Sequence, residues 1–495
     1  MNIKRSSGIL LHPTSFPSPY GIGSLGKEAY EFIDFLFESN QKLWQVFPLC
    51  PTGFGDSPYQ CFSAFAGNPL LIDLDFLIKE NLLFQEEILQ QGFSNNIVDY
   101  GPVINFKFNV LKKSYHHFIS YKNLDIKNEF DHFIIENKFW LDDYSLFMSL
   151  KDYFNGNSWN NWEKDIKFRK KEKISEYSLK LEKEINFYKY LQFIFFKQWK
   201  NLKNYANSKN ISIIGDVPIF VAFDSSDAWS NPELFLFDEN RNPTKVAGVP
   251  PDYFSETGQL WGNPLYNWDY LEKTSFKWWV DRVKSNLNLY DLIRIDHFRG
   301  FESFWAVPFG EKTAINGEWV KCPGEKLFST LKKELESLPI IAEDLGIITP
   351  EVESLRDTFS FPGMKILQFA FYPGQDNPYL PHNHIRNCIV YTGTHDNDTT
   401  LGWYNKLSYY DKEYIKKYLN LENDYDISWK LIKTAWSSVA NISITPLQDL
   451  LCLESFARIN TPGRAGGNWQ WRYEKHMLNS DISNKLKEIT NLYFR

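Results

Sequence analysis

The sequence predicts a (β/α)₈ TIM barrel, in which eight parallel strands form a closed sheet surrounded by helices. Short apolar runs recur along the chain, and each is followed by a loop rich in Gly, Pro, Asp or Asn. Runs of four to eight apolar residues that end in turn-forming residues are typical of buried strands in a parallel sheet. Helical patterns separate several of these runs, as in a barrel. The eight runs are residues 7–16, 42–53, 211–221, 291–301, 338–346, 364–371, 387–398 and 441–451.

We expect the whole chain, residues 1–495, to form a single catalytic barrel domain with insertions. The strand pattern is interrupted between about residues 70 and 200, where helical spacing, clearest over 183–202, predicts a mainly helical insertion packed on the barrel. A second long loop, at about residues 244–268, is rich in Pro, Gly and aromatic residues. Loops of that length are usually functional, so we interpret this one as a loop that covers a substrate.

Composition narrows the class of protein. With 43% hydrophobic and 23% charged residues, the chain can bury a packed core, and its net charge of −7 argues against a nucleic-acid or anionic-membrane partner.

The five cysteines form no CxxC pair, so we expect reduced thiols and neither a disulfide framework nor a zinc site. The apolar run near the N-terminus is too short for a signal peptide, and no segment approaches the ~20 apolar residues of a membrane span. We therefore expect a cytoplasmic enzyme.

Acidic residues follow several of the predicted strands. In the run 291–301, Arg294 and Asp296 share one side of a strand because side chains alternate with period two. A neighbouring positive charge lowers the pKa of a carboxyl group and holds it ionised, which suits a nucleophile. The alternative is a purely structural ion pair at the strand end.

Two further strand ends carry candidate acids. Glu343 and Asp344 cannot both face the barrel interior, and Glu343 shares parity with Ile341, so we place Glu343 inward. In an aromatic, partly dry site its pKa would rise and it could act as a general acid. The alternative makes Asp344 the N-cap of the next helix and Glu343 its solvated neighbour.

The last two acids are Asp396, which follows His395, and Asp216, which ends the run 211–221. Barrel active sites lie at the carboxyl ends of the strands, so four acids after four strands indicate one site. Glycoside cleavage with retention needs two carboxylates about 5 Å apart. A metal site would use His297, His395, Asp296 and Asp396 instead, but adjacent strand residues diverge and Arg294 would repel a cation.

The segments 213–221, 292–301, 340–346 and 391–398 resemble the four short conserved regions of the α-amylase clan, in the same order. Segments 8–26, 53–69, 248–268, 361–371 and 458–472 narrow the resemblance to the 4-α-glucanotransferases, also called amylomaltases or disproportionating enzymes. The similarity spans essentially the whole chain and is weakest in the helical insertion. It implies transfer of a 1,4-α-D-glucan segment to the 4-hydroxyl of an acceptor glucan or glucose by a retaining double displacement.

The resemblance implies a role for each candidate. Asp296 would be the nucleophile, Glu343 the general acid and base, and Asp396 the residue that binds sugar hydroxyls and stabilises the transition state. The implied substrate contacts are Tyr59, Asp216, Asp252, Gln259, Trp261, Arg294, His395 and Asn468.

The expected substrates are maltooligosaccharides and other α-1,4-glucans, without cofactor or metal, and the enzyme would be a monomer or weak homo-oligomer. Three other functions stay open: an α-glucan hydrolase with the same acids, a noncatalytic glucan-binding protein, and a metal-dependent barrel enzyme.

Overall fold

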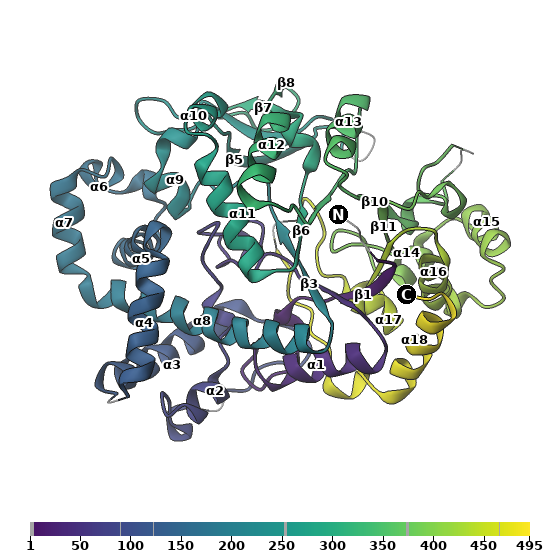
Figure 1. Cartoon of the computed structure of the whole chain (residues 1–495), viewed down its shortest axis with the longest axis horizontal. Helices are drawn as coiled ribbons and strands as arrows, with labels where there is room; N and C mark the ends of the chain where they lie inside the picture. The colour runs from purple at the N-terminus through teal and green to yellow at the C-terminus, as the bar shows by residue number, and fades with distance from the viewer. Residues whose placement is uncertain (1–3, 90, 122, 252–254, 373–375, 465) are drawn as a thin grey trace.

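Eight parallel strands form the centre of the protein in the computed structural model, which describes residues 4–89, 91–121, 123–251, 255–372, 376–464 and 466–495 (Figure 1). Each strand overlaps one of the eight predicted apolar runs, and the predicted TIM barrel is confirmed. The strands are β1 (Ser6–Leu10), β2 (Leu43–Gln45), β3 (Ser212–Val217), β6 (Leu292–Ile295), β9 (Ile340–Ala342), β10 (Gly363–Ile366), β11 (Cys388–Tyr391) and β12 (Ile442–Pro446).

The strands follow one another around the barrel in chain order, and β12 pairs with β1. The backbone N–H of Ala342, in β9, donates to the carbonyl of Pro362, directly before β10, at 3.0 Å. This hydrogen bond brings the two ends of the sheet together. Because all eight strands are parallel, their carboxyl ends lie at one mouth of the barrel.

The register of three strands decides which acids meet at that mouth. Asp216 of β3 lies opposite Arg294 of β6, and Ile295 of β6 lies opposite Ala342 of β9. One residue further on, Asp296 and Glu343 therefore follow neighbouring strands at the same level, and the Glu343 N–H donates to the Ile295 carbonyl at 3.0 Å. Neighbouring strands are ~5 Å apart, so these two acids can flank one bond.

Helices cover the outside of the barrel by burying one apolar stripe each. In α12, for example, Leu327, Phe328 and Leu331 are buried at helical spacing, whereas Lys332 and Lys333 are exposed. The helices that follow β1 and the later barrel strands are α1 (Lys27–Glu38), α9 (Ser226–Ser230), α10 (Trp268–Lys273), α11 (Lys277–Leu289), α12 (Gly324–Leu335), α13 (Pro350–Thr358), α14 (Thr400–Lys406), α15 (Tyr409–Leu419), α16 (Ile427–Ser437), α17 (Leu447–Leu450) and α18 (Ser480–Leu492).

Between β2 and β3 the chain forms a group of helices at one end of the molecule (left in Figure 1). The long α8 (Glu182–Ser208) leads from this group back to β3, and its buried aromatic face packs on the barrel core. The other helices of the group are α2 (Leu74–Lys79), α3 (Tyr100–Ser120), α4 (Leu124–Glu136), α5 (Lys138–Tyr153), α6 (Lys164–Lys167) and α7 (Lys171–Lys180).

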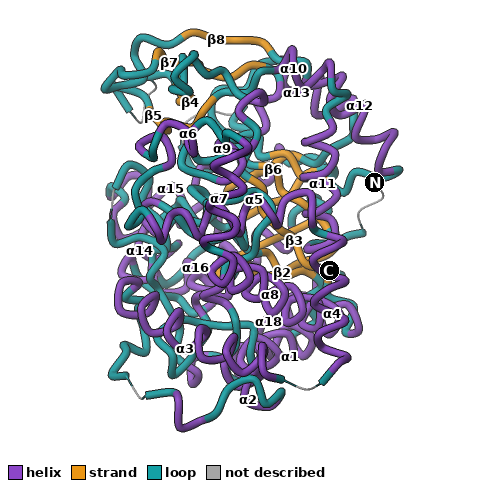
Figure 2. Tube along the Cα trace, turned by 90° about the vertical axis from the view of Figure 1, so that its left-hand side faces the viewer, coloured by secondary structure: helices purple, strands orange, loops and turns teal. Residues whose placement is uncertain are grey.

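A second, antiparallel sheet lies beside the barrel (top of Figure 2). Its strands, in the order β5-β4-β7-β8, are β4 (Lys245–Val249), β5 (Gln259–Pro264), β7 (Ser303–Pro308) and β8 (Glu318–Lys321). The segment 244–268, expected as a loop, therefore contributes two strands. The proline and glycine residues of this segment are typical of loops, so the sequence did not indicate strands. In addition, β4 pairs with β7, which lies beyond β6 in the chain and leaves no local pattern.

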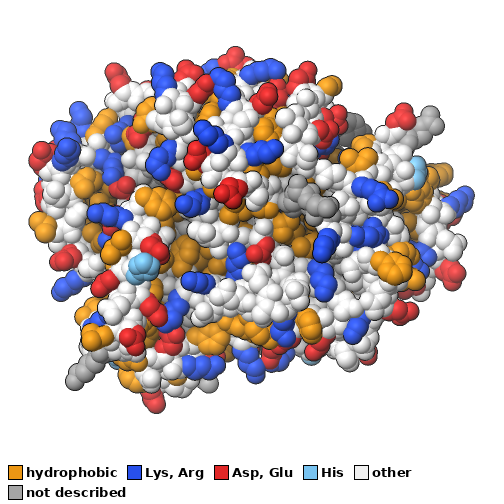
Figure 3. Space-filling model, viewed as in Figure 1, with side chains coloured by type: hydrophobic (Ala, Val, Ile, Leu, Met, Phe, Trp, Pro, Cys, Tyr) orange, Lys and Arg blue, Asp and Glu red, His pale blue; other side chains and the backbone are white. Residues whose placement is uncertain are grey.

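The surface carries both signs of charge. On the face shown in Figure 3, acidic and basic side chains of the described residues are interspersed. In the part of the chain that the structure describes, the helices are all too short or too polar to cross a bilayer.

Candidate active site

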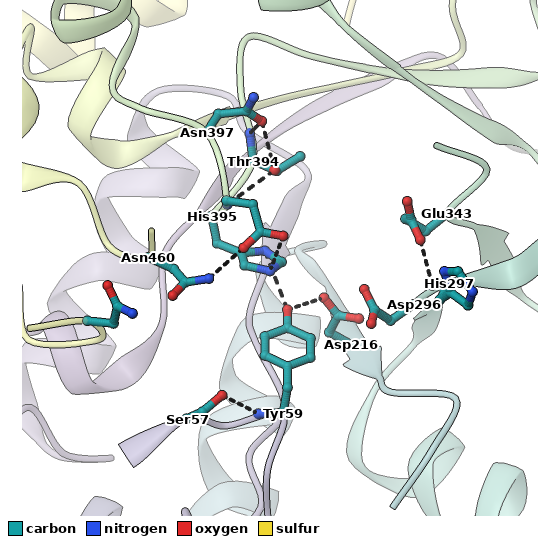
Figure 4. A network of polar contacts seen from close by, with 12 residues as sticks. Ser57, Tyr59, Asp216, Asp296, His297, Glu343, Thr394, His395, Asn397 and Asn460 are labelled. Carbon is teal, nitrogen blue, oxygen red and sulfur yellow. Dashed lines mark hydrogen bonds and ion pairs between the residues drawn. The ribbon is translucent and has the colours of Figure 1, made fainter. Parts of the chain in front are cut away.

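A buried arginine, Arg294, links two of the predicted acids at the barrel mouth. Figure 4 shows these two acids, Asp216 and Asp296, together with Glu343. Nη1 of Arg294 donates to Oδ2 of Asp216 at 2.5 Å and lies 3.1 Å from Oδ1 of Asp296. The side chains of Arg294 and Asp216 are 4% and 0% exposed, whereas that of Asp296 is 30% exposed. Asp216 therefore pairs with the arginine in the buried interior, and Asp296 presents its carboxylate to the cleft.

The charge state of Asp296 follows from this position. Burial raises the pKa of Asp296 to about 6, while the Arg294 guanidinium opposes that rise. We expected from the sequence that the arginine would hold the pKa low; its effect has that direction, but burial outweighs it. A pKa of about 6 still leaves the carboxylate mostly ionised at neutral pH.

Glu343 faces the same cleft from the end of β9. Its Oε2 accepts a hydrogen bond from the His297 backbone N–H at 2.6 Å. Burial and the negative charge of Asp296 raise the pKa of Glu343 well above its usual range. The two neighbouring carboxyl groups thus differ in their surroundings: Arg294 favours the ionised form of Asp296, whereas burial and the charge of Asp296 favour the protonated form of Glu343.

The neighbour of Glu343 has a structural role. Asp344 points away from the mouth, where its Oδ2 accepts from Nη1 of Arg356 at 2.5 Å and its Oδ1 accepts from the Met364 N–H at 2.7 Å. The N-cap of the next helix, α13, is Thr349. The inward placement of Glu343 is therefore the one observed, and the alternative with Asp344 as a cap does not occur.

Tyr59 and His395 form an aromatic wall next to these acids. The rings of Tyr59 and His395 stack with centroids 4.9 Å apart and an interplanar angle of 19°. The Tyr59 hydroxyl donates to Oδ2 of Asp216 at 2.8 Å. Burial and the nearby Asp216 raise the pKa of Tyr59 well above its usual value. The tyrosine therefore stays neutral and offers its half-buried ring to the cleft.

Asp396 is the most open of the acids, with 49% of its side chain exposed. Nδ2 of Asn460 donates to its Oδ1 at 2.6 Å, and Nε2 of His395 lies 3.4 Å from its Oδ2. A carboxylate held in this way can accept hydrogen bonds from a ligand in the cleft.

Three residues that support this site were not predicted from the sequence. Asn460 positions Asp396, and Trp469 packs against Tyr59 and His395 with ring centroids 5.7 Å from each. Asp449 is buried beneath the loop that carries Asp396. Asn460 and Trp469 lie in the segment 458–472, so the resemblance could have found them. Asp449 lies in the predicted run 441–451, so its position after a strand could have marked it.

Asp449 holds both ends of the loop between β11 and α14. Its Oδ2 accepts from the Thr392 hydroxyl at 2.6 Å, and its Oδ1 accepts from the Thr400 N–H at 2.6 Å. Since His395 and Asp396 lie between these two threonines, the buried carboxylate fixes the loop that presents them.

Gln259, Trp261 and Asn468 are the other predicted contacts that the structure describes. Trp261, on β5, packs edge-on against His297 with centroids 4.8 Å apart, and its Nε1 donates to Oε1 of Gln259 at 3.2 Å. Asn468 uses its amide within its own loop, where its Oδ1 accepts from the Thr461 N–H at 3.0 Å. Asp252 lies outside the described residues.

The donor set does not favour a metal ion. The position between Asp216 and Asp296 is occupied by the Arg294 guanidinium, which pairs with both carboxylates and would repel a cation. At His297 the backbone angle φ is 52°, and the ring packs against Trp261. Among the described residues, no group of three or more His, Cys, Asp or Glu is placed to bind a metal.

The arrangement can perform one kind of chemistry well. Two carboxyl groups lie at adjacent strand ends, one beside an arginine and one in surroundings that raise its pKa, and such a pair is used by retaining glycoside enzymes. The aromatic wall beside them suits a sugar, because sugars present apolar C–H faces that lie flat on rings.

Comparison with known proteins agrees with this geometry. The sequence profile of the 4-alpha-glucanotransferases matches residues 11–478. A 4-alpha-glucanotransferase from Clostridium butyricum is 53% identical over 98% of this chain and 100% of the relative, and one from Thermus thermophilus is 49% identical over 99% of both.

Solved structures show the same relationship. An amylomaltase from Streptococcus agalactiae, solved in complex with acarbose, is 43% identical and superposes with a TM-score of 0.96 over 99% of this chain and 100% of that one. A Corynebacterium glutamicum amylomaltase, 17% identical with a TM-score of 0.78, covers 98% of this chain and 75% of its own and shares the fold. The chain therefore belongs to the 4-alpha-glucanotransferase family.

Proposed function

We propose that this 4-alpha-glucanotransferase works by a retaining double displacement in which Asp296 is the nucleophile and Glu343 is the general acid and base. The observation that carries the proposal is the pair of carboxyl groups at adjacent strand ends, with Arg294 beside Asp296 and with surroundings that raise the pKa of Glu343 well above its usual range. The substrates are maltooligosaccharides and other α-1,4-glucans.

In the first step, a carboxylate oxygen of Asp296 attacks C1 of the donor glucose. The bond from C1 to the glycosidic oxygen breaks, and Glu343 gives its proton to that oxygen, so a shortened glucan leaves with a free 4-hydroxyl. The raised pKa of Glu343 favours the protonated form, which this step requires.

In the second step, the 4-hydroxyl of an acceptor attacks C1 of the glycosyl–Asp296 ester. Glu343, now a carboxylate, takes the proton of that hydroxyl, and the ester bond to Asp296 breaks. Two inversions at C1 restore the α linkage. Arg294 stabilises the Asp296 carboxylate each time it is released.

The other predicted residues would hold the sugar. Asp396, oriented by Asn460 and His395, accepts hydrogen bonds from hydroxyls of the glucose whose C1 is attacked. These hydrogen bonds strengthen as positive charge develops on the sugar ring. Tyr59 offers a stacking surface to the same glucose. We assign Asp216 and Arg294 to support of the nucleophile.

Transfer requires that an acceptor sugar, rather than water, attack the glycosyl–enzyme. Trp261 and Gln259 project from the second sheet, and Trp261 contacts His297, whose N–H binds Glu343. They would form a cover that reduces access of water, and Asn468 would contact the acceptor side. If the barrier to attack by water is about 3–4 kcal/mol higher than the barrier to attack by the acceptor, transfer is favoured over hydrolysis by a few hundredfold.

We further propose that the chain acts as one catalytic domain, with the helical group at about residues 70–200 as an insertion, and as a monomer or weak homo-oligomer. A cytoplasmic location is supported by the five cysteines, all of which are free thiols in the structure.

Incubation with maltotriose tests the proposed function. Transfer should produce free glucose and a ladder of longer maltooligosaccharides with no rise in total reducing ends, as measured by chromatography and a reducing-sugar assay. A rise in reducing ends that parallels glucose release would show hydrolysis and contradict the proposal.

Replacing Trp261 by alanine should raise hydrolysis relative to transfer, because the cover over Glu343 would lose its largest ring. The ratio of reducing ends formed to glucose released from maltotriose measures this change, and we expect it to increase several-fold. Trp319→Ala is the matched control, since Trp319 is 39% exposed on β8 of the same sheet. Equal ratios in the two variants would contradict the role of Trp261.

The pH dependence of kcat/KM should show an acid limb with an apparent pKa of about 6, because protonation of Asp296 removes the nucleophile. Below that pH, activity should fall about tenfold per unit, and the alkaline limb should report loss of the Glu343 proton. In Asp216→Asn the acid limb should move to lower pH, since Asp216 raises the pKa of Asp296. An acid limb that Asp216→Asn leaves in place would show that another group controls it.

A further inference from the structure

Exposed tyrosines gather on the helix α15 and in the short segment that follows it. Tyr409, Tyr410 and Tyr414, on α15, are 72%, 84% and 45% exposed, and Tyr425, shortly after that helix, is 79% exposed. We call these four residues the tyrosine face. Among the described residues, the other tyrosines exposed to a similar degree are Tyr153 and Tyr372.

The folding of α15 does not require these rings. Ile415 and Leu419 are the residues of this helix that are buried and anchor it to the core. Tyr410 contacts only its neighbour Tyr409 among the ring pairs of the described residues, with centroids 5.9 Å apart. Grouped apolar side chains left in water commonly mark a binding surface.

The tyrosine face is connected to the catalytic mouth through the loop after β10. Tyr418, the last aromatic residue of α15, packs on Phe371 with centroids 5.6 Å apart, and its hydroxyl lies 2.8 Å from Nδ1 of His382. In the same loop, Nε2 of Gln368 donates to the carbonyl of Asp398 at 2.9 Å. Asp398 belongs to the loop that carries Asp396, so the surface adjoins the element that presents a catalytic acid.

We propose that the tyrosine face is a second binding site for α-1,4-glucan, which holds a distant part of a long chain while another part occupies the cleft. The proposal rests on the 4-alpha-glucanotransferase activity of the chain, which makes long α-glucans its substrate. Tyrosine rings can stack on the C–H faces of glucose units and their hydroxyls can bond to sugar hydroxyls.

The residues between the tyrosines favour a sugar over a protein partner. Asp411, Lys412 and Glu413 interrupt the tyrosines along the helix, and Lys416 pairs with Asp424 at 3.1 Å beside it. The cores of protein interfaces are depleted in Lys, Asp and Glu, whereas charged groups next to rings supply hydrogen bonds to hydroxyls. The mixture therefore fits a polyhydroxylated chain.

Such a site should matter only for long substrates. A glucan that reaches both places binds with two linked contacts, so the second contact raises the effective concentration of the chain at the cleft. Maltotriose is too short to gain from this linkage and should not depend on the tyrosine face.

The test compares Tyr409→Ser/Tyr410→Ser/Tyr414→Ser with wild type on amylose and on maltotriose. We expect KM for amylose to rise about tenfold, as when one of two linked contacts is lost, with kcat/KM for maltotriose unchanged. Tyr153→Ser is the matched control, because Tyr153 is a 42% exposed tyrosine on α5, at the opposite end of the molecule from α15 (Figure 1). The single variant Tyr410→Ser, at the most exposed ring, should show a smaller rise and protects the test against misfolding of the triple variant.

A binding measurement separates this proposal from the proposed mechanism. In an Asp296→Asn background, the triple variant should lose most of its retardation in a native gel that contains amylopectin, and the Tyr153→Ser control should keep it. Undiminished retardation and an unchanged KM for amylose would overturn the proposal, as would an equal loss of activity on maltotriose and amylose. Failure of the maltotriose assay in the wild type would instead contradict the proposed function and leave the gel result interpretable.

Discussion

Replacing Asp296 by asparagine is expected to lower kcat on maltotriose by about 10⁴-fold or more, the scale seen when a covalent nucleophile is removed. The amide is close in shape and can remain beside Arg294, but it cannot form the glycosyl ester. The variant should also fail to form a glycosyl adduct with an activated glycosyl fluoride, as measured by mass spectrometry of the intact protein.

The matched control for this change is Asp269→Asn, at an exposed aspartate on α10. It should keep full activity and still form the adduct. An adduct on another residue of Asp296→Asn, or a loss of activity in Asp269→Asn of the same size, would contradict the assignment of Asp296 as nucleophile.

Replacing Glu343 by glutamine is expected to lower activity on maltotriose by about 10²–10⁴-fold, the usual contribution of a general acid and base. With a glycosyl fluoride the first step should remain fast, because fluoride leaves without a proton. The second step should be slow, so the glycosyl–Asp296 ester should accumulate, and mass spectrometry should detect it.

A small anionic nucleophile, such as azide, needs no general base and should release the accumulated sugar from Glu343→Gln. Glu334→Gln, at an exposed glutamate on α12, is the control and should behave as wild type. An equal loss of rate with the fluoride and with maltotriose would show that Glu343 does not act as the acid.

The barrel could be predicted because its strands are buried on both sides. Such strands appear in the sequence as continuous apolar runs that end in turn residues, and all eight were located in this way. The second sheet could not be located, since β4 contains glycine, β5 contains glycine and proline, and β4 pairs with β7, which is distant in the sequence. Pairings between distant segments leave no local pattern.

The catalytic acids could be proposed from position and parity, because strands have a fixed side-chain period. Parity placed Glu343 inward, and the structure shows why Asp344 cannot compete: it is held by Arg356 on the outside. The direction of the pKa shift of Asp296 could not be predicted, since the sequence shows the arginine, which lowers the pKa, but not the burial, which raises it more. Likewise, Asn460 reaches Asp396 only because the fold brings two distant loops together.

The separation of the two sheets has a consequence for how this enzyme could diversify. Trp261 and Gln259 project from strands that hydrogen-bond to one another and to no strand of the barrel among the described residues. Sequence changes that reshape this outer layer can therefore accumulate without disturbing the ladder that fixes Asp296 beside Glu343. Selection for new product lengths would act first on the outer layer, and the reacting groups would be inherited unchanged.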